Sequence, residues 1–168
     1  MVCFYLLCLV LMKKKLLNKD HFECREKFPI NFVYFYEAEP FDECVLFMKN
    51  LSLICNLNVV NYCPEDVDKI QRYMIMKQGL EHIINDYEMK AIILGTRATD
   101  PFASTQSDFS PSDSNNGWPE FMRVNPILNW RFNEIWDFLK SNTLAYPTPY
   151  DEGYTYLGEK MDTMKNPF

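Results

Sequence analysis

Glycine and basic side chains are scarce in this sequence of 168 residues. It contains 5 glycines, although most phosphate-binding loops are rich in glycine. Its 17 basic side chains are outnumbered by 23 acidic ones, which gives a net charge of -6. Because nucleic-acid-binding proteins neutralise phosphates with lysine and arginine, this balance argues against a nucleic acid as partner. Any phosphate that the protein binds is therefore expected to belong to a small ligand.

Cysteine motifs of metal sites are also missing. The sequence has no C-x-x-C pair, and only His21 and His82 could complete a mixed cysteine and histidine site. Most of the cysteines lie in apolar runs, where a free thiol behaves as a small hydrophobic side chain. We expect reduced, buried thiols rather than disulfides or zinc ligands at all six positions. These are Cys3, Cys8, Cys24, Cys44, Cys55 and Cys63.

The apolar segment from Met1 to Met12 is followed by three lysines, residues 13–15. A secretory signal has its positive charge before the apolar stretch, and a membrane span needs about 20 apolar residues. We therefore expect a helix that is covered on most sides by protein, with the lysines at the negative end of its dipole. This interpretation predicts a cytoplasmic protein that binds no membrane.

Hydrophobic residues, at 48%, are sufficient for the core of one domain, and aromatic residues reach 15%. Short strand-like runs alternate with helical patterns, which predicts an α/β fold with a parallel sheet. The expected strands are 30–36, 57–62, 90–94 and 121–124, and the expected helices after the first are 40–55, 64–86 and 131–140.

Three further expectations concern the elements. The inner face of helix 64–86 is expected to carry Ile70, Tyr73, Met74, Leu80, Ile83 and Ile84. Residues 99–119 hold three prolines and many serines, so they are expected to form one long loop. No strand precedes the first helix, although crossover helices in a parallel sheet normally follow one, so the first strand is expected to be absent.

The first candidate site is Gly95-Thr96-Arg97-Ala98-Thr99-Asp100, at the carboxyl end of a predicted parallel strand. Ligands of open α/β sheets bind at that edge. Gly95 would let a ligand approach the backbone, Arg97 offers a planar fork for phosphate oxygens, and Asp100 could hold Mg²⁺. Alternatively, Gly95 ends the strand, Asp100 caps a turn and Arg97 forms a surface ion pair.

The second candidate site lies between Asp113 and Trp130, where a polar loop re-enters the core. Trp118 and Met122 could provide apolar faces for a planar heteroaromatic ligand, and Asp113 or Arg123 a polar contact. Alternatively, Trp118 and Trp130 anchor the loop and the last helix to the core.

Together these stretches resemble the eukaryotic FAD synthase (FMN adenylyltransferase) family, within the phosphoadenosine phosphosulfate reductase-like superfamily with its adenine nucleotide α-hydrolase-like fold. The resemblance is carried by G-T-R-x-T-D-P-F, N-x-W-P-x-F-M-R-x-N-P-I-L-x-W, I-W-D-F-L and the segment 150–158. It covers residues 91–167 most closely, and the first half of the chain more loosely.

The resemblance implies an α/β domain with a doubly wound, mostly parallel sheet and helices on both faces. It also implies transfer of AMP from ATP to FMN, which yields FAD and pyrophosphate with Mg²⁺. It implies that Gly95 and Arg97 bind ATP and that Asp100 acts in catalysis with Arg97, at or near the metal. The flavin pocket would contain Asp113, Trp118, Met122, Arg123 and Tyr154. Such a reaction positions two anionic ligands and needs no protein nucleophile, which agrees with the lack of a Ser/His or Cys/His constellation. ATP and FMN are the expected partners, and the protein is expected to be a monomer.

The sequence departs from this family at both ends. The phosphate-binding loop of the S-x-N-G-G-K-D type is absent, and so is the tail with its arginines. We therefore expect a single domain, residues 1–168, that is truncated at both ends, binds flavin weakly and forms little or no FAD on its own. The alternatives are a non-catalytic flavin-binding or interaction module, and another nucleotide-adenylating or sulfonucleotide enzyme of the same superfamily.

Overall fold

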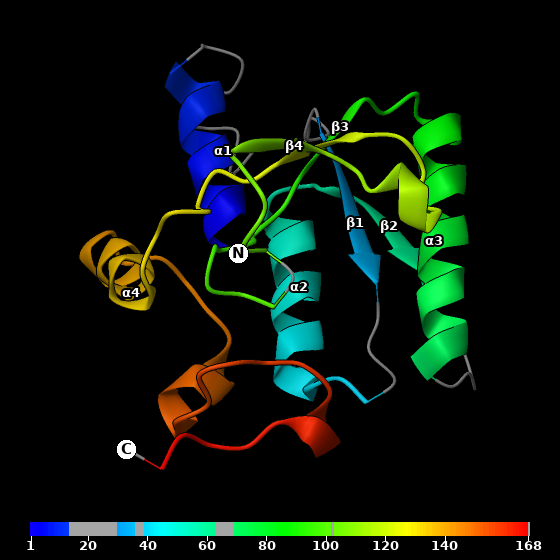
Figure 1. Cartoon of the computed structure of the whole chain (residues 1–168). Helices are drawn as coiled ribbons and strands as arrows, with labels where there is room; N and C mark the ends of the chain where they lie inside the picture. Colours follow the sequence, from blue (N-terminus) through cyan, green and yellow to red (C-terminus); the bar gives the residue numbers. More distant parts are fainter. Residues whose placement is uncertain (14–29, 36–38, 63–68, 102, 168) are drawn as a thin grey trace. The chain divides into compact units, whose positions relative to one another are not determined.

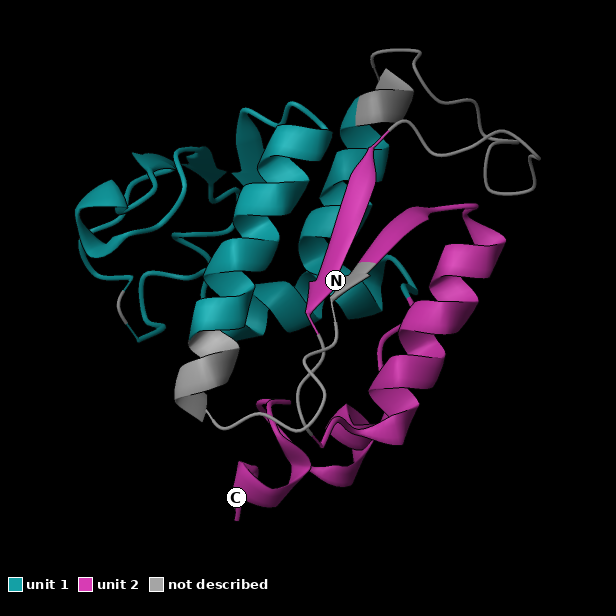
Figure 2. Cartoon of the chain, turned by 90° about the vertical axis from the view of Figure 1, so that its right-hand side faces the viewer, with its two compact units in different colours: residues 1–13, 73–144 teal, residues 14–72, 145–168 magenta. Residues whose placement is uncertain are grey.

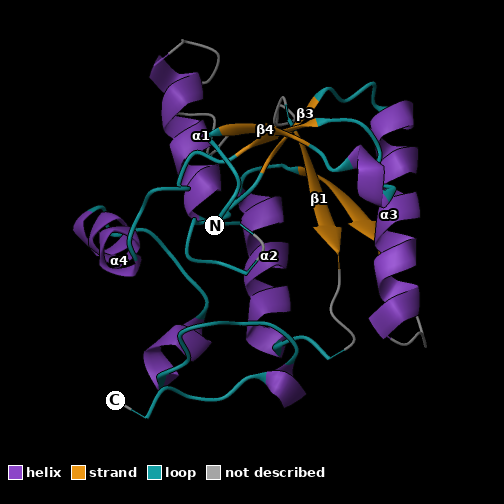
Figure 3. Ribbon diagram, in the orientation of Figure 1, coloured by secondary structure: helices purple, strands orange, loops and turns teal. Residues whose placement is uncertain are grey.

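The computed structural model describes residues 1–13, 30–35, 39–62, 69–101 and 103–167 (Figure 1). Its helices and strands confirm the α/β class (Figure 3). They alternate along the chain as far as β3, after which β4 and β5 follow with no α-helix between them. The α-helices are α1 (Val2–Lys13), α2 (Asp42–Ile54), α3 (Lys69–Asp86) and α4 (Phe132–Ser141). The strands are β1 (Asn31–Phe35), β2 (Asn58–Tyr62), β3 (Ala91–Ile93), β4 (Phe109–Pro111) and β5 (Met122–Val124). Short 3₁₀ helices are η2 (Ser114–Asn116), η3 (Thr148–Glu152) and η4 (Lys160–Asp162).

The chain divides into two compact units (Figure 2). Unit 1 consists of Met1–Lys13 and Tyr73–Leu144, and unit 2 of Lys14–Arg72 and Ala145–Phe168. Each unit is therefore assembled from two separate stretches of sequence.

Unit 1 contains a three-stranded sheet with the order β3-β5-β4. Strands β3 and β5 are parallel and pair Ile93 with Val124, so their carboxyl ends lie at the same edge. Strand β4 is antiparallel to β5 and pairs Pro111 with Met122. The connection from β4 to β5 therefore lies at the opposite edge of this sheet.

The predicted long loop, residues 99–119, is wrong in one respect, because it contains β4 and η2. Strand β4 has only three residues, one of them proline, so it carries no periodic signal of its own. It forms because β5 provides a partner. Ser112 fastens the end of this pairing: its backbone N–H donates to the carbonyl of Phe121 at 2.8 Å, and its hydroxyl donates to the carbonyl of Pro119 at 2.6 Å.

The core of unit 1 joins α1 to α4. Val2, Ile127 and Leu139 are buried, and half-buried side chains of the first turns of α1 and of α4 pack around them. The predicted helix at residues 1–12 is confirmed. Its expected covering is confirmed for residues 2–8, which are buried or half-buried, but not for Leu9 and Val10, which are 52% and 54% exposed. This core reaches only the first two turns of α1, and both residues lie beyond them.

Helix α3 confirms most of the predicted inner face that can be described. Leu80 and Ile83 are buried and Ile84 is half-buried, as their i, i+3, i+4 spacing requires. Met74 is 50% exposed, so its predicted place is wrong. It precedes Ile83 by nine residues, and at 3.6 residues per turn it therefore lies on the opposite side of the helix. The predicted helix start at 64–68 and the side chains of Ile70 and Tyr73 lie outside the described residues.

Unit 2 contains the parallel pair β1 and β2, in which Asn31 is opposite Asn58 and Phe35 opposite Tyr62. Helix α2 connects the two strands, so the predicted strand-helix-strand unit is confirmed. After α4 the chain is irregular apart from η3 and η4, which also follows the prediction. Phe41 and Tyr154 pack edge to face with ring centroids 5.0 Å apart, and the N–H of Lys160 donates to the carbonyl of Glu39 at 2.8 Å.

The described cysteines agree with the expected reduced state. Cys3, Cys8, Cys44 and Cys55 are free thiols; Cys8 and Cys55 are buried as expected, whereas Cys3 and Cys44 are only half-buried. Cys24 and Cys63 lie outside the described residues. Over the part of the chain that the structure describes, no helix combines the length and apolarity needed to cross a membrane.

Candidate functional site

The loop from Gly95 to Asp100 begins where β3 ends, at the carboxyl edge of the unit 1 sheet. The N–H of Leu94 donates to the carbonyl of Val124 at 2.9 Å, which extends the pairing of β3 with β5. The N–H of Ala98 donates to the carbonyl of Leu128 at 2.7 Å. The loop is therefore held to the segment that follows β5, at the edge where the sequence predicted it.

Arg97 and Asp100 form a closed pair within this loop. The backbone N–H of Arg97 donates to Asp100 Oδ2 at 2.8 Å, and Arg97 Nη2 donates to Asp100 Oδ1 at 2.9 Å. Both side chains remain accessible, at 27% and 31%. This is the turn cap and ion pair of the alternative interpretation. It also holds the guanidinium in one orientation and leaves further N–H donors of Arg97 for a ligand.

Neither backbone strain nor close packing accounts for the glycine at position 95. Its φ lies outside the left-handed region, and a Cβ there would meet only Cys3 Sγ, at 4.0 Å. A methyl group would therefore fit the folded chain. The close approach of a ligand remains a reason for glycine at this place.

The polar loop between β4 and β5 forms a compact turn. The carbonyl of Asp113 accepts hydrogen bonds from the N–H groups of Asn116 at 3.1 Å and Trp118 at 3.3 Å. The carboxylate of Asp113 accepts another from Asn116 Nδ2 at 2.5 Å. Gly117 has φ of 74°, a left-handed conformation that favours glycine. We call the segment 113–118 the Trp118 turn.

Lys77 of α3 contacts this turn, and sequence reasoning missed it. Its ammonium donates to the carbonyl of Asn116 and lies over the indole of Trp118, 5.3 Å from the ring centroid. No motif connects two positions that are 39 residues apart, so no local signal could have revealed the contact.

Met122 and Arg123 lie on β5. Met122 is 37% exposed, and Arg123 Nη2 donates to the carbonyl of Pro111 at 2.6 Å. Arg123 Nε is buried and makes no hydrogen bond with the described residues. The next polar residue, Asn125, is completely buried, and its amide nitrogen donates to Gln106 Oε1 at 3.1 Å and to the carbonyl of Ser107 at 2.9 Å. Asn125 is a second residue that the sequence analysis did not single out.

The predicted site residues fall into separate groups. Gly95, Arg97 and Asp100 lie at the carboxyl edge of the unit 1 sheet, whereas the Trp118 turn lies at the other edge. The two groups are separated by the length of β5, which at about 3.3 Å per residue is roughly 10 Å. Tyr154 belongs to unit 2 and packs on Phe41. Trp130 packs against Phe138 and the core of unit 1, as the alternative interpretation expected.

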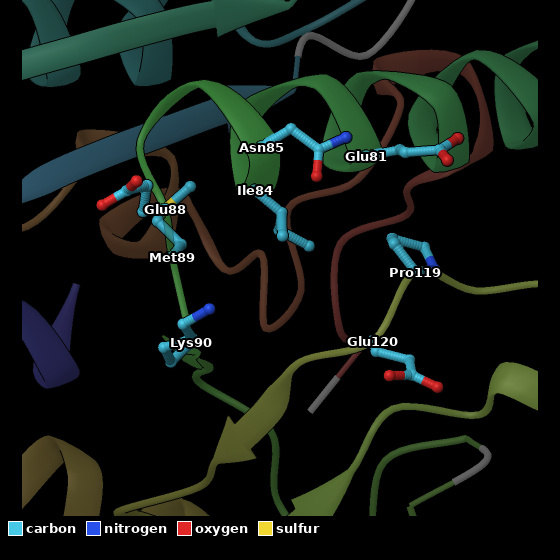
Figure 4. Close-up of a pocket in the computed structure, with 8 residues that line it drawn as sticks. All are labelled: Glu81, Ile84, Asn85, Glu88, Met89, Lys90, Pro119 and Glu120. Atoms are coloured by element: carbon cyan, nitrogen blue, oxygen red, sulfur yellow. The ribbon is translucent and has the colours of Figure 1, made fainter.

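A cavity of about 570 Å³ lies at the carboxyl end of α3 (Figure 4). None of the predicted site residues lines it. Three carboxylates and one ammonium face it, so it disfavours anionic ligands such as nucleotides. Its lining consists of Glu81, Ile84, Asn85, Glu88, Met89, Lys90, Pro119 and Glu120.

Among the described residues, no group of three or more cysteine, histidine or carboxylate side chains could hold a metal ion. Asp100 offers a single carboxylate, and each of its oxygens accepts one hydrogen bond from Arg97. A carboxylate has about four lone-pair positions, so Asp100 retains the capacity for one metal contact. Because Mg²⁺ is commonly held by one or two carboxylates together with phosphates of the substrate, this donor set fits a metal that arrives with a nucleotide.

Comparison with known proteins connects these features to a family. The model of the phosphoadenosine phosphosulfate reductase domain matches residues 8–165. A curated protein of Schizosaccharomyces pombe named probable FAD synthase is 32% identical over 164 residues, which are 97% of this chain and 56% of that protein. The chain therefore spans little more than half the length of this relative.

Solved structures give the same result. Candida glabrata FMN adenylyltransferase with FMN and the ATP analogue AMPCPP superposes with a TM-score of 0.70 and 29% identity, over 80% of this chain and 45% of that one. The same enzyme with FAD and inorganic pyrophosphate superposes with a TM-score of 0.71 and 29% identity, over 80% of this chain and 43% of that one. The fold of the chain is thus that of these proteins.

Proposed function

Because the chain belongs to the phosphoadenosine phosphosulfate reductase domain family, we propose that it binds FMN and ATP and provides part of the site of an FMN adenylyltransferase. One observation carries this proposal: a relative named probable FAD synthase aligns with 97% of the chain, so the similarity includes both candidate loops. The similar structures that hold FMN with an ATP analogue, and FAD with pyrophosphate, support the same substrates and products.

The loop from Gly95 to Asp100 would bind the nucleotide phosphates. Arg97 is held by two hydrogen bonds to Asp100, so little conformational entropy is lost when its remaining N–H groups bind phosphate oxygens. Because Gly95 has no side chain of its own, those oxygens could approach its backbone closely.

The Trp118 turn and β5 would bind the flavin. Trp118 would stack on the isoalloxazine ring, and Met122 would add an apolar contact. The carboxylate of Asp113 would accept a hydrogen bond from an N–H group at the polar edge of the ring. Arg123, whose Nη2 donates to the carbonyl of Pro111, would add a cationic contact beside β4 and β5. Tyr154 is a further flavin-binding candidate, contributed by unit 2.

The separation of the two groups suits a ligand with two different ends. FMN carries its ring at one end and its phosphate at the other, with a ribityl chain between them. Its ring could therefore lie at the Trp118 turn while its phosphate points to the edge that holds Arg97. This arrangement places the flavin phosphate and the ATP phosphates next to the same cationic group.

Adenylyl transfer then needs orientation more than acid-base chemistry. An oxygen of the FMN phosphate attacks the α-phosphorus of ATP, the bond to the β-phosphate oxygen breaks, and pyrophosphate leaves. Arg97 would offset the negative charge that both ligands bring together. Mg²⁺, when bound with ATP, would neutralise further phosphate charge, and Asp100 is the described carboxylate that would hold it.

The test is ligand binding by the chain. FMN titrated against the protein, followed by quenching of flavin fluorescence, should bind more tightly than riboflavin, because riboflavin has no phosphate. Trp118→Ala should lower the affinity for FMN by about tenfold, which corresponds to the loss of one aromatic contact of about 1 kcal/mol or more. Tyr87→Ala is the control, because Tyr87 is an exposed aromatic side chain outside both candidate loops.

Two outcomes would redirect the proposal. Binding of adenosine 3′-phosphate 5′-phosphosulfate in preference to FMN would favour the sulfonucleotide alternative. Binding of FMN together with no binding of ATP in the presence of Mg²⁺ would favour a flavin-binding module.

A further inference from the structure

We propose that Asn125 is a positioning residue for the nucleotide: its buried amide fixes the segment 103–108, and this segment holds the turn that carries Arg97 and Asp100. The proposal deepens the proposed function, and it rests on that function in so far as the ligand of Arg97 is ATP. The contacts that Asn125 makes within the chain do not depend on it.

Asn125 directly follows β5, at the carboxyl edge of the unit 1 sheet where the loop from Gly95 to Asp100 begins. It is completely buried, and asparagine is buried in this way mainly where its polar atoms are bonded. Its backbone N–H donates to the carbonyl of Asp108 at 2.9 Å, and this bond continues the pairing of β4 with β5. The side chain of Asn125 is therefore enclosed in unit 1 at the edge of the first candidate site.

The amide of Asn125 joins the end of β5 to the segment that precedes β4. Its Nδ2 atom donates to Gln106 Oε1 at 3.1 Å and to the carbonyl of Ser107 at 2.9 Å, so both of its N–H groups are used. Because the carbonyl of Ser107 can only accept, this contact also identifies which amide atom is the nitrogen. The amide thus holds the segment 103–108 in a defined orientation.

Backbone hydrogen bonds continue this attachment from Gln106 to Asp100. The N–H of Gln106 donates to the carbonyl of Ala103 at 3.0 Å, and the N–H of Ala103 donates to the carbonyl of Asp100 at 3.2 Å. Ala103 is completely buried, so this short path is packed as well as hydrogen-bonded. The carboxylate of Asp100 in turn accepts from the guanidinium of Arg97 at 2.9 Å. The position of Arg97 therefore depends on the segment that Asn125 holds.

A second path connects Asn125 to the same turn through the backbone alone. The carbonyl of Asn125 accepts from the N–H of Leu128 at 3.2 Å, and the carbonyl of Leu128 accepts from the N–H of Ala98 at 2.7 Å. Both paths thus end within residues 97–100. Truncation of the Asn125 side chain removes its contacts with the first path and keeps the backbone bonds of the second, so it tests the amide specifically.

Three substitutions test this attachment from both of its ends. Asn125→Ala removes the amide, and Asn125→Ser keeps one donor in a small side chain, so it should preserve part of the effect. Gln106→Ala removes one of the two acceptors. Asn133→Ala is the matched control, because Asn133 is an exposed asparagine on α4 of the same unit.

The first measurement is competition of ATP and of adenosine with a fluorescent ATP analogue in Mg²⁺, on the complete chain. We expect the dissociation constant of ATP to rise about tenfold in Asn125→Ala, about threefold in Asn125→Ser and Gln106→Ala, and less than about twofold in Asn133→Ala. Adenosine has no phosphates for Arg97 to bind, so its dissociation constant should change less than about twofold in all four variants. A general loosening of the chain would raise both dissociation constants together.

The second measurement is amide hydrogen exchange without ligand, followed by ¹H–¹⁵N NMR. The N–H of Ala103 donates to Asp100, and in Asn125→Ala it should exchange at least about tenfold faster. The N–H of Ile135 donates to the carbonyl of Arg131 in α4, and its exchange should change less than about threefold. The difference between the two N–H groups reports a local effect of the amide.

The two measurements distinguish failure of the positioning role from failure of the proposed function. If the unaltered chain does not bind ATP, the proposed function fails, and hydrogen exchange alone decides whether Asn125 holds the turn. Unchanged exchange of the Ala103 N–H in Asn125→Ala overturns the positioning role. In a chain that binds ATP, an unchanged ATP affinity, or equal losses for ATP and adenosine, also overturns it. If Asn125→Ala does not fold by circular dichroism, Asn125→Ser and Gln106→Ala provide the same comparisons.

Discussion

Asp100 has two carboxylate oxygens, and both contact Arg97. A residue that the sequence indicates as a metal ligand is thus also the group that orients a cation. These two roles differ in their dependence on the metal: orientation of Arg97 operates whether or not Mg²⁺ is present, whereas metal coordination does not.

Asp100→Ala should therefore weaken ATP binding by about tenfold in EDTA, and by more in the presence of Mg²⁺. The reason is that Arg97 loses its fixed orientation in both conditions and the metal loses a ligand in one. Titration of a fluorescent ATP analogue under the two conditions measures both effects. Asp108→Ala is the control, because the structure uses the backbone carbonyl of Asp108 to bind Asn125. Tighter binding of ATP by Asp100→Ala would mean that relief of charge repulsion outweighs orientation.

Leu139 is among the largest completely buried side chains of the described residues, so its truncation is expected to affect stability strongly. Its side chain is completely buried in the core that joins α1 to α4. Leu139→Ala should lower the free energy of unfolding by about 2–5 kcal/mol, measured by urea denaturation. Leu53→Ala, at an exposed leucine of α2, should change it by less than about 0.5 kcal/mol. Equal effects of the two substitutions would contradict the packing described for α4.

Sequence motifs identified candidate residues only where they are consecutive or nearly so. Gly95, Arg97 and Asp100 lie within six positions, and their loop was expected at the edge where it lies. Lys77 and Asn125 were missed because their contacts are made by elements that are distant in sequence. Lys77 lies in no quoted motif, and Asn125 lies in one that did not indicate its role; only folding brings the two side chains to their partners.

At the scale of elements, the sequence pattern predicted most helices and strands. Strands β1, β2, β3 and β5 and helices α2 and α4 were expected within about two residues of their observed bounds. Strand β4 was not expected, since pairing with β5 rather than its own sequence creates it. As a consequence, the sequence did not reveal that the Trp118 turn lies at the other edge of the sheet from Arg97.

The Trp118 turn makes its own prediction at this scale. Gly117→Ala should destabilise the protein by about 1 kcal/mol, because alanine is strained at φ of 74°. It should also shift the ¹H–¹⁵N resonance of the Trp118 indole N–H and lower the affinity for FMN.

Gly95→Ala is the matched glycine control. It should leave the unfolding midpoint unchanged, because a β-carbon there meets nothing nearer than 4.0 Å. It should, however, lower the affinity of the chain for ATP. Thermal unfolding combined with the two ligand titrations distinguishes a glycine required by the backbone from one required by a ligand. Equal losses of stability in both variants would contradict this distinction.

For the whole molecule, buried thiols predict how stability depends on pH. Burial raises the pKa of Cys3, Cys44 and Cys55 above the ordinary value of 9.0. The unfolded chain therefore loses these protons at a lower pH than the folded chain does. The stabilisation is complete below about pH 9 and is lost as the pH rises further.

Urea denaturation should accordingly give a lower midpoint at about pH 9.7 than at about pH 7.5. Cys3→Ala should reduce this difference, since its neutral side chain does not titrate. A midpoint that is independent of pH across this range would mean that the thiols are more accessible to water than the structure indicates.

The division of the chain into two units, each built from two stretches of sequence, has a consequence for synthesis on the ribosome. The two stretches of unit 1 have both been synthesised only when the chain reaches Leu144, and unit 2 also needs the residues from Ala145 onward. The apolar helix α1 must therefore remain without its core partners on α4 while more than a hundred residues are added, which takes about 6–30 s at translation rates of 5–20 residues per second. During this interval α1 is an exposed apolar segment, and the nascent chain is expected to depend on chaperones that bind such segments.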